Sequence, residues 1–204
     1  LFRSSIKNTY GVKDSSLNKW KWGPGGEGVI HAIDPGDANT IYTSSFYGQL
    51  IKANLDLADS LQERSIAPPK DSLEDIHRGE WLAYTMISPH DNKTIYHGFQ
   101  YLFKSTDQGT TWKRISGDLS YNNKEHMGKT PYAINHQAIV AIDESPIEQG
   151  ILYVGTDDGR VWCSMNDGSA WFEITGGLPS GVHVSRLVAS TQARLAAPRL
   201  VTRT

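Results

Sequence analysis

The sequence contains one cysteine, Cys163, among its 204 residues. A single thiol excludes an internal disulfide and a cysteine-rich zinc site. No apolar run is long enough to span a bilayer, so we expect no membrane insertion. With 20 basic and 22 acidic residues the formal net charge is -2, so the chain has no basic field that would attract nucleic acid. These absences exclude two classes of partner, while 38% apolar residues are enough for a core.

Three segments of the chain resemble one another in the order of their strand-like and turn-like residues. Each has an alternating apolar strand, a turn with a proline, a second strand, and a polar turn that leads to a third strand. Their prolines, Pro35, Pro89 and Pro146, are 54 and 57 residues apart. Regular spacing of this length indicates repeated structural units. The segments are GVIHAIDPGDANTIYTSSFYGQLIKANL, LAYTMISPHDNKTIYHGFQYLFKSTDQGTTW and AIVAIDESPIEQGILYVGTDDGRVWCSMNDGSAW.

The apolar residues within each unit alternate with a period of two, which is typical of strands and not of helices. Short antiparallel strands joined by proline, glycine and aspartate turns are typical of β-propeller blades. We therefore predict an all-β protein built of propeller blades with four antiparallel strands each. The boundaries that we expect are a trailing half blade at 1–24, three blades at 25–73, 74–133 and 134–181, and a leading half blade at 182–204.

The two half blades leave two arrangements open. Propellers have four to eight blades, so the halves either pair within one four-bladed wheel or belong to a larger propeller. We favour part of a larger propeller, because the chain starts without methionine and its tail departs from the repeat. In that case the exposed blade edges are apolar, and we expect self-association through them.

A tryptophan-containing turn lies between the third and fourth strands of the second unit. Its spaced residues are Ser105, Asp107, Gly109, Thr111 and Trp112. A short carboxylate accepts hydrogen bonds from main-chain N–H groups of its own turn, and glycine supplies the positive φ of a tight hairpin. We therefore predict that this turn is structural and not catalytic. A weaker copy in the third unit has Ser164, Asn166, Gly168 and Trp171.

This pattern resembles the Asp-box, or BNR repeat, of sialidases, sortilin-type receptors and related propellers. Over most of residues 25–190 the chain is also similar to large secreted bacterial propeller proteins related to sortilin-type and xyloglucanase-type propellers, which are often labelled glycosyl hydrolases. The resemblance implies that the turns lie at the periphery of the propeller. It also implies an exported protein that is secreted, periplasmic or on the cell surface.

A xyloglucanase-type site needs two carboxylates that face each other across a cleft. Glu27 and Glu80 precede the first strands of successive blades, and first strands line the axial channel of a propeller. These two residues are the catalytic candidates, although solvated turn carboxylates are the commoner arrangement. No local motif singles out a pair, so the sequence leaves enzymatic activity open. A sialidase is disfavoured, because the arginines occur singly and at unmatched positions.

The candidates for ligand binding lie near the starts of the first strands. They are Arg78, Trp81, His136 and His183. Histidines and glutamates together can bind a metal, but HxH and HExxH spacings are missing, so we expect no metal site and no cofactor. The preferred hypothesis is a non-catalytic binding or assembly module that recognises a protein or a glycan. The alternative is a xyloglucanase-like glycoside hydrolase with a carboxylate pair at the axial cleft.

Overall fold

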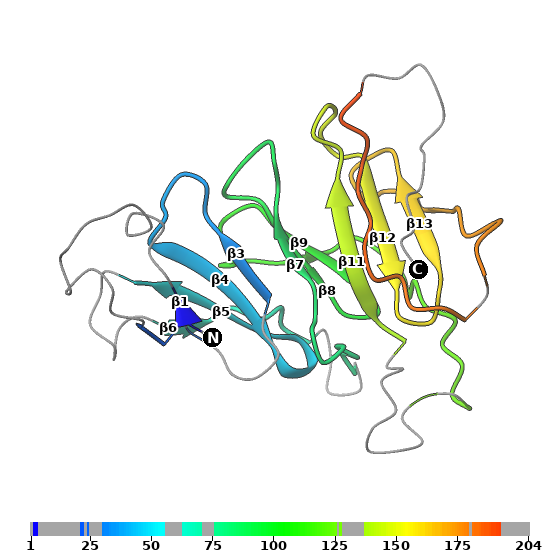
Figure 1. The fold of residues 1–204 in the computed structure, drawn as a ribbon, viewed down its shortest axis with the longest axis horizontal. Helices are drawn as coiled ribbons and strands as arrows, with labels where there is room; N and C mark the ends of the chain where they lie inside the picture. The colour runs from blue at the N-terminus through cyan, green and yellow to red at the C-terminus, as the bar shows by residue number, and fades with distance from the viewer. Residues whose placement is uncertain are drawn as a thin grey trace.

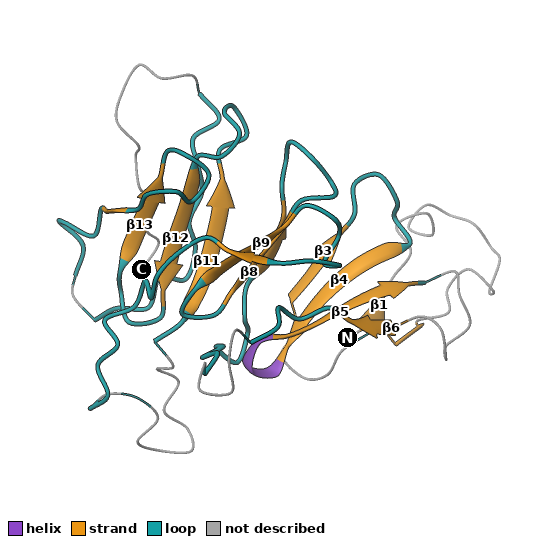
Figure 2. Ribbon diagram, turned by 180° about the vertical axis from the view of Figure 1, so that it is seen from behind, coloured by secondary structure: helices purple, strands orange, loops and turns teal. Residues whose placement is uncertain are grey.

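The computed structural model describes residues 2–3, 21–22, 24, 30–55, 63–70, 76–125, 127, 137–179 and 181–192. Within these residues the regular structure consists of β-strands and one short 3-10 helix (Figure 2). None of their helices has the length and apolar character needed to cross a membrane. The prediction of an all-β fold is confirmed.

The strands form three four-stranded antiparallel sheets, each a meander in chain order. The first sheet contains β3 (Ile30–Ile33), β4 (Thr40–Ser45), β5 (Gln49–Asn54) and β6 (Glu63–Ser65), with the 3-10 helix η2 (Phe46–Gly48) between β4 and β5. The second sheet contains β7 (Thr85–Ile87), β8 (Ile95–Gly98), β9 (Leu102–Ser105) and β10 (Lys113–Arg114). The third sheet contains β11 (Ile139–Glu144), β12 (Leu152–Thr156), β13 (Val161–Ser164) and β14 (Phe172–Glu173). A separate two-stranded sheet pairs β1 (Phe2–Arg3) with β2 (Lys21–Trp22).

The three sheets lie side by side in chain order (Figure 1). Buried residues of neighbouring sheets form shared clusters, so the core lies between sheets. Tyr42, Leu50, Ile66 and Ile95 join the first sheet to the second, and Tyr96, Leu102, Ile139 and Leu152 belong to the cluster that joins the second to the third. Strand β4 is buried at all six positions, because this sheet is covered on both faces. This arrangement of four-stranded sheets is that of consecutive propeller blades.

The turn at residues 105–112 is closed by its own side chains. Asp107 Oδ1 accepts hydrogen bonds from Ser105 Oγ at 2.7 Å and from the Thr111 N–H at 2.8 Å. Its Oδ2 accepts a bond from Thr111 Oγ1 at 2.6 Å. Bonds from Thr111 stabilise the ionised form and lower the pKa of Asp107 to about 2. Gly109, at φ 81°, donates its N–H to Ser105 Oγ at 2.8 Å.

The turn at residues 164–171 repeats this geometry with an amide in place of the carboxylate. Asn166 Oδ1 accepts the Ala170 N–H at 2.8 Å, and Ser164 Oγ accepts the Gly168 N–H at 2.9 Å. Ala170 has no hydroxyl, so the second bond that Thr111 makes in the first turn has no counterpart here. The bonds that the two turns share, which include the one from Ser164 Oγ to Asn166 Oδ1, are therefore enough to close the second turn.

Both tryptophans bond to the preceding sheet, a link that the sequence did not reveal. Trp112 Nε1 donates to the Ile66 carbonyl at 2.8 Å, and Trp171 Nε1 donates to the Ile115 carbonyl at 2.9 Å. The neighbouring glycine lies against the same isoleucine, since a Cβ on Gly109 would stand 2.4 Å from Ile66 Cδ1. Each tryptophan turn therefore fastens its own sheet to the one before it.

We predict that Trp112→Phe lowers the free energy of unfolding by about 1–3 kcal/mol, because the Ile66 carbonyl then loses its donor. Urea denaturation followed by circular dichroism measures the change. Trp81→Phe is the matched control, since Trp81 is exposed and contacts other rings, and we expect a change under about 0.5 kcal/mol. Equal losses in the two variants would contradict the role of the indole N–H.

Candidate ligand-binding face

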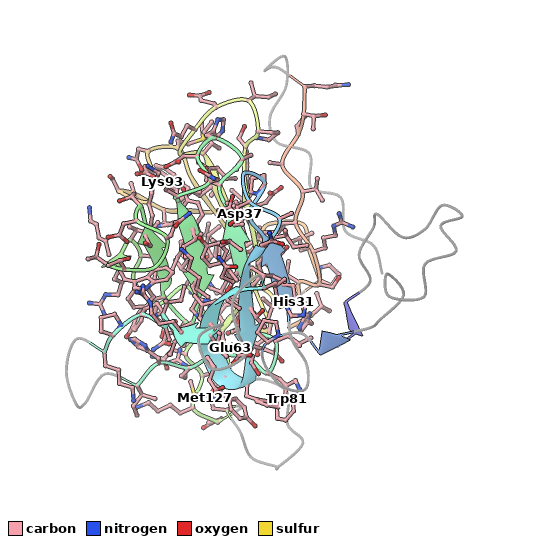
Figure 3. The ribbon with its side chains drawn as sticks, turned by 90° about the vertical axis from the view of Figure 1, so that its left-hand side faces the viewer. His31, Asp37, Glu63, Trp81, Lys93 and Met127 are labelled. Atoms are coloured by element: carbon pink, nitrogen blue, oxygen red, sulfur yellow. The ribbon has the colours of Figure 1, made fainter. Side chains whose placement is uncertain are left out.

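The sheets have two ends that differ in character. Asp37 and Lys93 lie at one end, in the turns between first and second strands, and Trp81 and Met127 lie at the opposite end (Figure 3). We call these the turn end and the Trp81 end. The turn end carries residues 34–39, 88–93 and the two tryptophan turns. The Trp81 end carries η2, residues 76–82, 99–101, 117–125 and 156–160.

Several side chains at the turn end bond to a neighbouring sheet or turn. Asp34 Oδ1 accepts Asn92 Nδ2 at 2.9 Å, which links the first two sheets. Two lysines at matching positions of third strands extend to the following tryptophan turn: Lys52 Nζ donates to Gln108 Oε1 at 2.7 Å, and Lys104 Nζ donates to Asp167 at 2.7 Å. These polar groups join neighbouring sheets, and the turn end has a structural role.

The Trp81 end exposes a cluster of aromatic rings. Trp81 packs edge to face on Phe46 and Tyr47, with centroid distances of 4.7 Å and 5.4 Å. Tyr47 is 53% exposed and Trp81 is 36% exposed. Gly79 permits this contact, because a Cβ there would stand 2.3 Å from the Tyr47 carbonyl carbon. The first two sheets therefore present a continuous aromatic surface made from both.

Glu80 is nearly buried beside this cluster, with 4% of its surface exposed. Its Oε2 accepts a hydrogen bond from the Leu82 N–H, which curls the segment ahead of β7. Its proposed catalytic partner, Glu27, lies outside the described residues. The structure therefore places one member of the predicted pair at the Trp81 end and does not test the pair.

Arg78 is bound within the protein. Its Nη2 forms an ion pair with Asp118 Oδ2 at 2.7 Å and donates to Ser120 Oγ at 3.0 Å. Its main-chain N–H donates to Gln100 Oε1 at 2.7 Å. These bonds hold the segment that enters β7 to the segment that leaves β10. Arg78 therefore positions the loops of the Trp81 end.

The acidic turn at residues 156–160 fixes the loop that enters the third sheet. Asp157 accepts the N–H groups of Gln137 and Ala138 at 3.1 and 2.8 Å. Asp158 accepts the Tyr121 N–H at 2.7 Å. Both aspartates are 5% exposed. Their carboxylates therefore satisfy main-chain donors.

Arg160, in the same turn, bonds both the third sheet and the segment that follows the second sheet. Its guanidinium bonds both carboxylate oxygens of Glu173, at 3.2 and 2.7 Å, and lies 4.3 Å from the Trp162 ring centroid. It also donates to the Ser120 carbonyl at 2.8 Å. The hydrogen bonds with Arg160 lower the pKa of Glu173. The loops of the second and third sheets are thus held in one arrangement.

The described histidines His183 and His97 lie in different environments, one exposed and the other buried. His183 is exposed on the segment after the third sheet, and His136 lies outside the described residues. His97 is fully buried between the first two sheets, where it bonds Thr85 Oγ1 at 2.6 Å and the Gly48 carbonyl at 3.0 Å. Burial lowers the pKa of His97 to about 4. Among the described residues, no group of three or more His, Cys, Asp or Glu side chains is arranged to hold a metal ion.

Sequence reasoning identified Trp81 but missed Phe46 and Tyr47. Their signal was the pair of aromatic residues before a glycine in SSFYGQL, a composition that is unusual for a tight turn. Tyr47 adopts φ 55°, in the left-handed region, and η2 turns its ring outward to where Trp81 packs. This placement depends on a contact across 34 residues of sequence, between the first sheet and the segment ahead of the second.

Comparison with known proteins supports a propeller fold. No protein-family model and no curated protein matches the chain. The chain is similar to the GH74 xyloglucanase from Xanthomonas campestris, with 17% identity and a TM-score of 0.52 over 80% of this chain and 26% of that one. An ancestral GH74 enzyme has 19% identity and a TM-score of 0.50, over 74% of this chain and 20% of that one.

A third similar structure is the extracellular domain of a hybrid two-component system from B. thetaiotaomicron. It has 15% identity and a TM-score of 0.50, over 79% of this chain and 19% of that one. At these identities the likeness shows the fold alone. The chain spans about a quarter of the length of the structures that it matches, or less. The predicted fold, part of a β-propeller with four-stranded blades, is confirmed.

We predict that acid weakens the contact between the first two sheets through His97. Its pKa is about 4 in the folded chain and near 6.5 in the unfolded chain, so the unfolded state binds the extra proton between these values. Stability should therefore fall as pH drops from 6.5 to 4, by up to about 1.4 kcal/mol per pH unit for this group. Urea unfolding at a series of pH values measures the slope.

The His97→Gln variant provides the comparison. We expect it to be less stable at pH 7, because the bonds to Thr85 and Gly48 are lost or distorted, but to show a flatter dependence between pH 4 and 6.5. An unchanged slope in that window would assign the acid sensitivity to other groups.

Proposed function

We propose that this chain is a binding or assembly module of a β-propeller and that its Trp81 end contacts the ligand, a glycan or a protein. The observation that carries this proposal is the aromatic cluster of Phe46, Tyr47 and Trp81, in which Tyr47 and Trp81 are exposed. Exposed Trp and Tyr rings offer a large apolar face with a polar edge, which suits both sugar rings and protein side chains. The segment that carries Trp81 is held by the ion pair of Arg78 with Asp118 and by the bond from the Arg78 N–H to Gln100, so little ordering is needed on binding.

The carboxylates of this end support binding over catalysis. A general acid or base must exchange a proton with the substrate. Asp118 instead pairs with Arg78, and Asp157 and Asp158 accept main-chain N–H groups. Glu80 accepts the Leu82 N–H. These four carboxylates thus have partners within the chain.

The tryptophan turns support an exported protein. Their pattern resembles the Asp-box of sortilin-type and xyloglucanase-type propellers, and one similar structure is an extracellular domain. We therefore propose a secreted, periplasmic or cell-surface location.

A glycoside hydrolase is the second candidate, favoured by the position of Glu80. This carboxyl group is nearly buried and adjoins an exposed tryptophan. A hydrolase would need a second carboxylate at roughly 5–10 Å from the first, depending on whether it retains or inverts configuration. Glu27 is the sequence candidate for that partner.

We predict that Trp81→Ala weakens glycan binding at least tenfold, because the exposed ring of the cluster is lost. Affinity electrophoresis and calorimetry against xyloglucan, mixed-linkage β-glucan, mannan and chitin oligosaccharides measure the change. Phe172→Ala is the matched control, since Phe172 is 59% exposed on β14 of the third sheet and should not affect binding. Equal weakening by both variants would remove the Trp81 end as the site, and no binding to any glycan would leave a protein as the ligand class.

The hydrolase alternative has its own test. If the chain releases reducing sugar from any of these polysaccharides, Glu80→Gln and Glu27→Gln should each lower the rate at least a hundredfold, because either change removes one carboxyl group of the pair. Glu125→Gln, at an exposed glutamate of the same end, should retain full activity. Activity that survives in the Glu80 variant would exclude Glu80 as a catalytic group.

A further inference from the structure

Neighbouring sheets contact each other through two repeated parts. At the inner part, the first strand of one sheet packs on the second strand of the sheet before it. A Cβ on Gly98 would stand 2.7 Å from Ile139 Cγ2 and 3.4 Å from Ile142 Cδ1, and the Ile139 N–H donates to the Phe99 carbonyl at 2.8 Å. At the outer part, the tryptophan turn bonds the isoleucine that follows the fourth strand, Ile66 or Ile115.

The inner part occurs once more, beyond the third sheet. A Cβ on Gly155 would stand 2.4 Å from Val184 Cγ1 and 3.4 Å from Leu187 Cδ1. The Val184 N–H donates to the Thr156 carbonyl at 3.2 Å. Gly155 and Thr156 of the third sheet match Gly98 and Phe99 of the second in the repeat. Residues 184–187 thus occupy on the third sheet the place that β11 occupies on the second.

At the outer part of the third sheet, the isoleucine carbonyl that would accept a tryptophan N–H has no such donor among the described residues. Ile174 follows β14 as Ile66 follows β6 and Ile115 follows β10. The N–H of each donates to the matching third-strand carbonyl, at 2.8 Å for Ile174 and 2.9 Å for the other two. Within the described part of the chain, however, no bond to the Ile174 carbonyl is found, whereas those of Ile66 and Ile115 each accept an indole N–H.

The two isoleucines that accept a tryptophan N–H are also more deeply buried than Ile174. Ile66 and Ile115 are 5% and 8% exposed beneath their tryptophan turns, whereas Ile174 is only partly buried. It belongs to the cluster of Ala141, Val161, Val184 and Leu187, in which the described residues include no tryptophan. The third sheet therefore presents the same surface as the first two, without the turn that covers it there.

We propose that Gly155, Ile174 and the segment 184–187 form the docking surface for one further propeller blade, whose third-to-fourth-strand turn donates a tryptophan N–H to the Ile174 carbonyl. The surface has the same parts as the two interfaces between sheets that are already present in the chain. The occupant that fits it is therefore another blade of the same kind. A second copy of the described chain does not fit, because its Trp112 and Trp171 are already bonded to Ile66 and Ile115. The described residues 182–192 then begin that blade.

The test supplies the second to fourth strands of such a blade to the full chain as a separate peptide. A synthetic copy of residues 145–178 contains the second to fourth strands of a blade and a tryptophan turn. It should raise the unfolding temperature of the chain in a concentration-dependent way, as any ligand of the folded state does. The same peptide with Trp171→Ala should need at least ten times the concentration for an equal shift. No shift, or equal shifts from the two peptides, would overturn the proposal.

Two variants of the full chain locate the contact. Ile174→Arg should abolish the shift, because the long side chain blocks the approach of the turn glycine. Ile33→Arg is the matched control at an exposed position of β3 in the first sheet, and it should leave the shift unchanged. The comparison of the two peptides on the unaltered chain is independent of whether either variant folds. Analytical ultracentrifugation that detects a dimer dissolved by Ile174→Arg would show a second copy on this surface and overturn the proposed occupant.

Discussion

The hydrogen bond from a turn tryptophan to a carbonyl of the preceding sheet is the constraint on which the arrangement of the sheets depends. A four-stranded sheet with two apolar faces has no stable orientation until both faces are covered. Hydrophobic contact alone does not set the register between such faces, because it is not directional. An indole N–H with one acceptor, a glycine against an isoleucine, and a lysine between third strand and turn set the register at both interfaces.

With the sheets held in this register, the two ends of the molecule have different roles for their side chains. The turn end uses its polar groups to join sheets, so Asp34, Lys52 and Lys104 are bonded within the protein. The Trp81 end receives the longer connections between sheets, and these are the segments that bring together residues of different blades. Its aromatic surface exists because η2 of the first sheet and the segment before β7 meet there. Propeller scaffolds serve many functions, and the character of such an end, more than the fold, decides which one.

The fold could be predicted in its main features, and the candidate site only in part. Period-two runs such as TIYTSS and LYVGT became β4 and β12, and the spacing of Ser105, Asp107 and Gly109 indicated a turn that closes on itself. Trp81 was identified from its type and its place before a first strand. Arg78 was also selected, and the structure adds its ion pair with Asp118, 40 residues away. The sequence gives no signal for that pairing.

The sequence by itself determined the strands, their turns and the repeat, because these follow from side-chain alternation and from hydrogen bonds within a few residues. Only the tertiary structure decided which groups meet across sheets: Trp112 with Ile66, His97 with Gly48, and Phe46 with Trp81. Such contacts join residues 35 to 49 positions apart. Their geometry depends on how two twisted sheets pack, and many registers satisfy the same local pattern. The folded chain selects one of them, and with it the side chains that are exposed at each end.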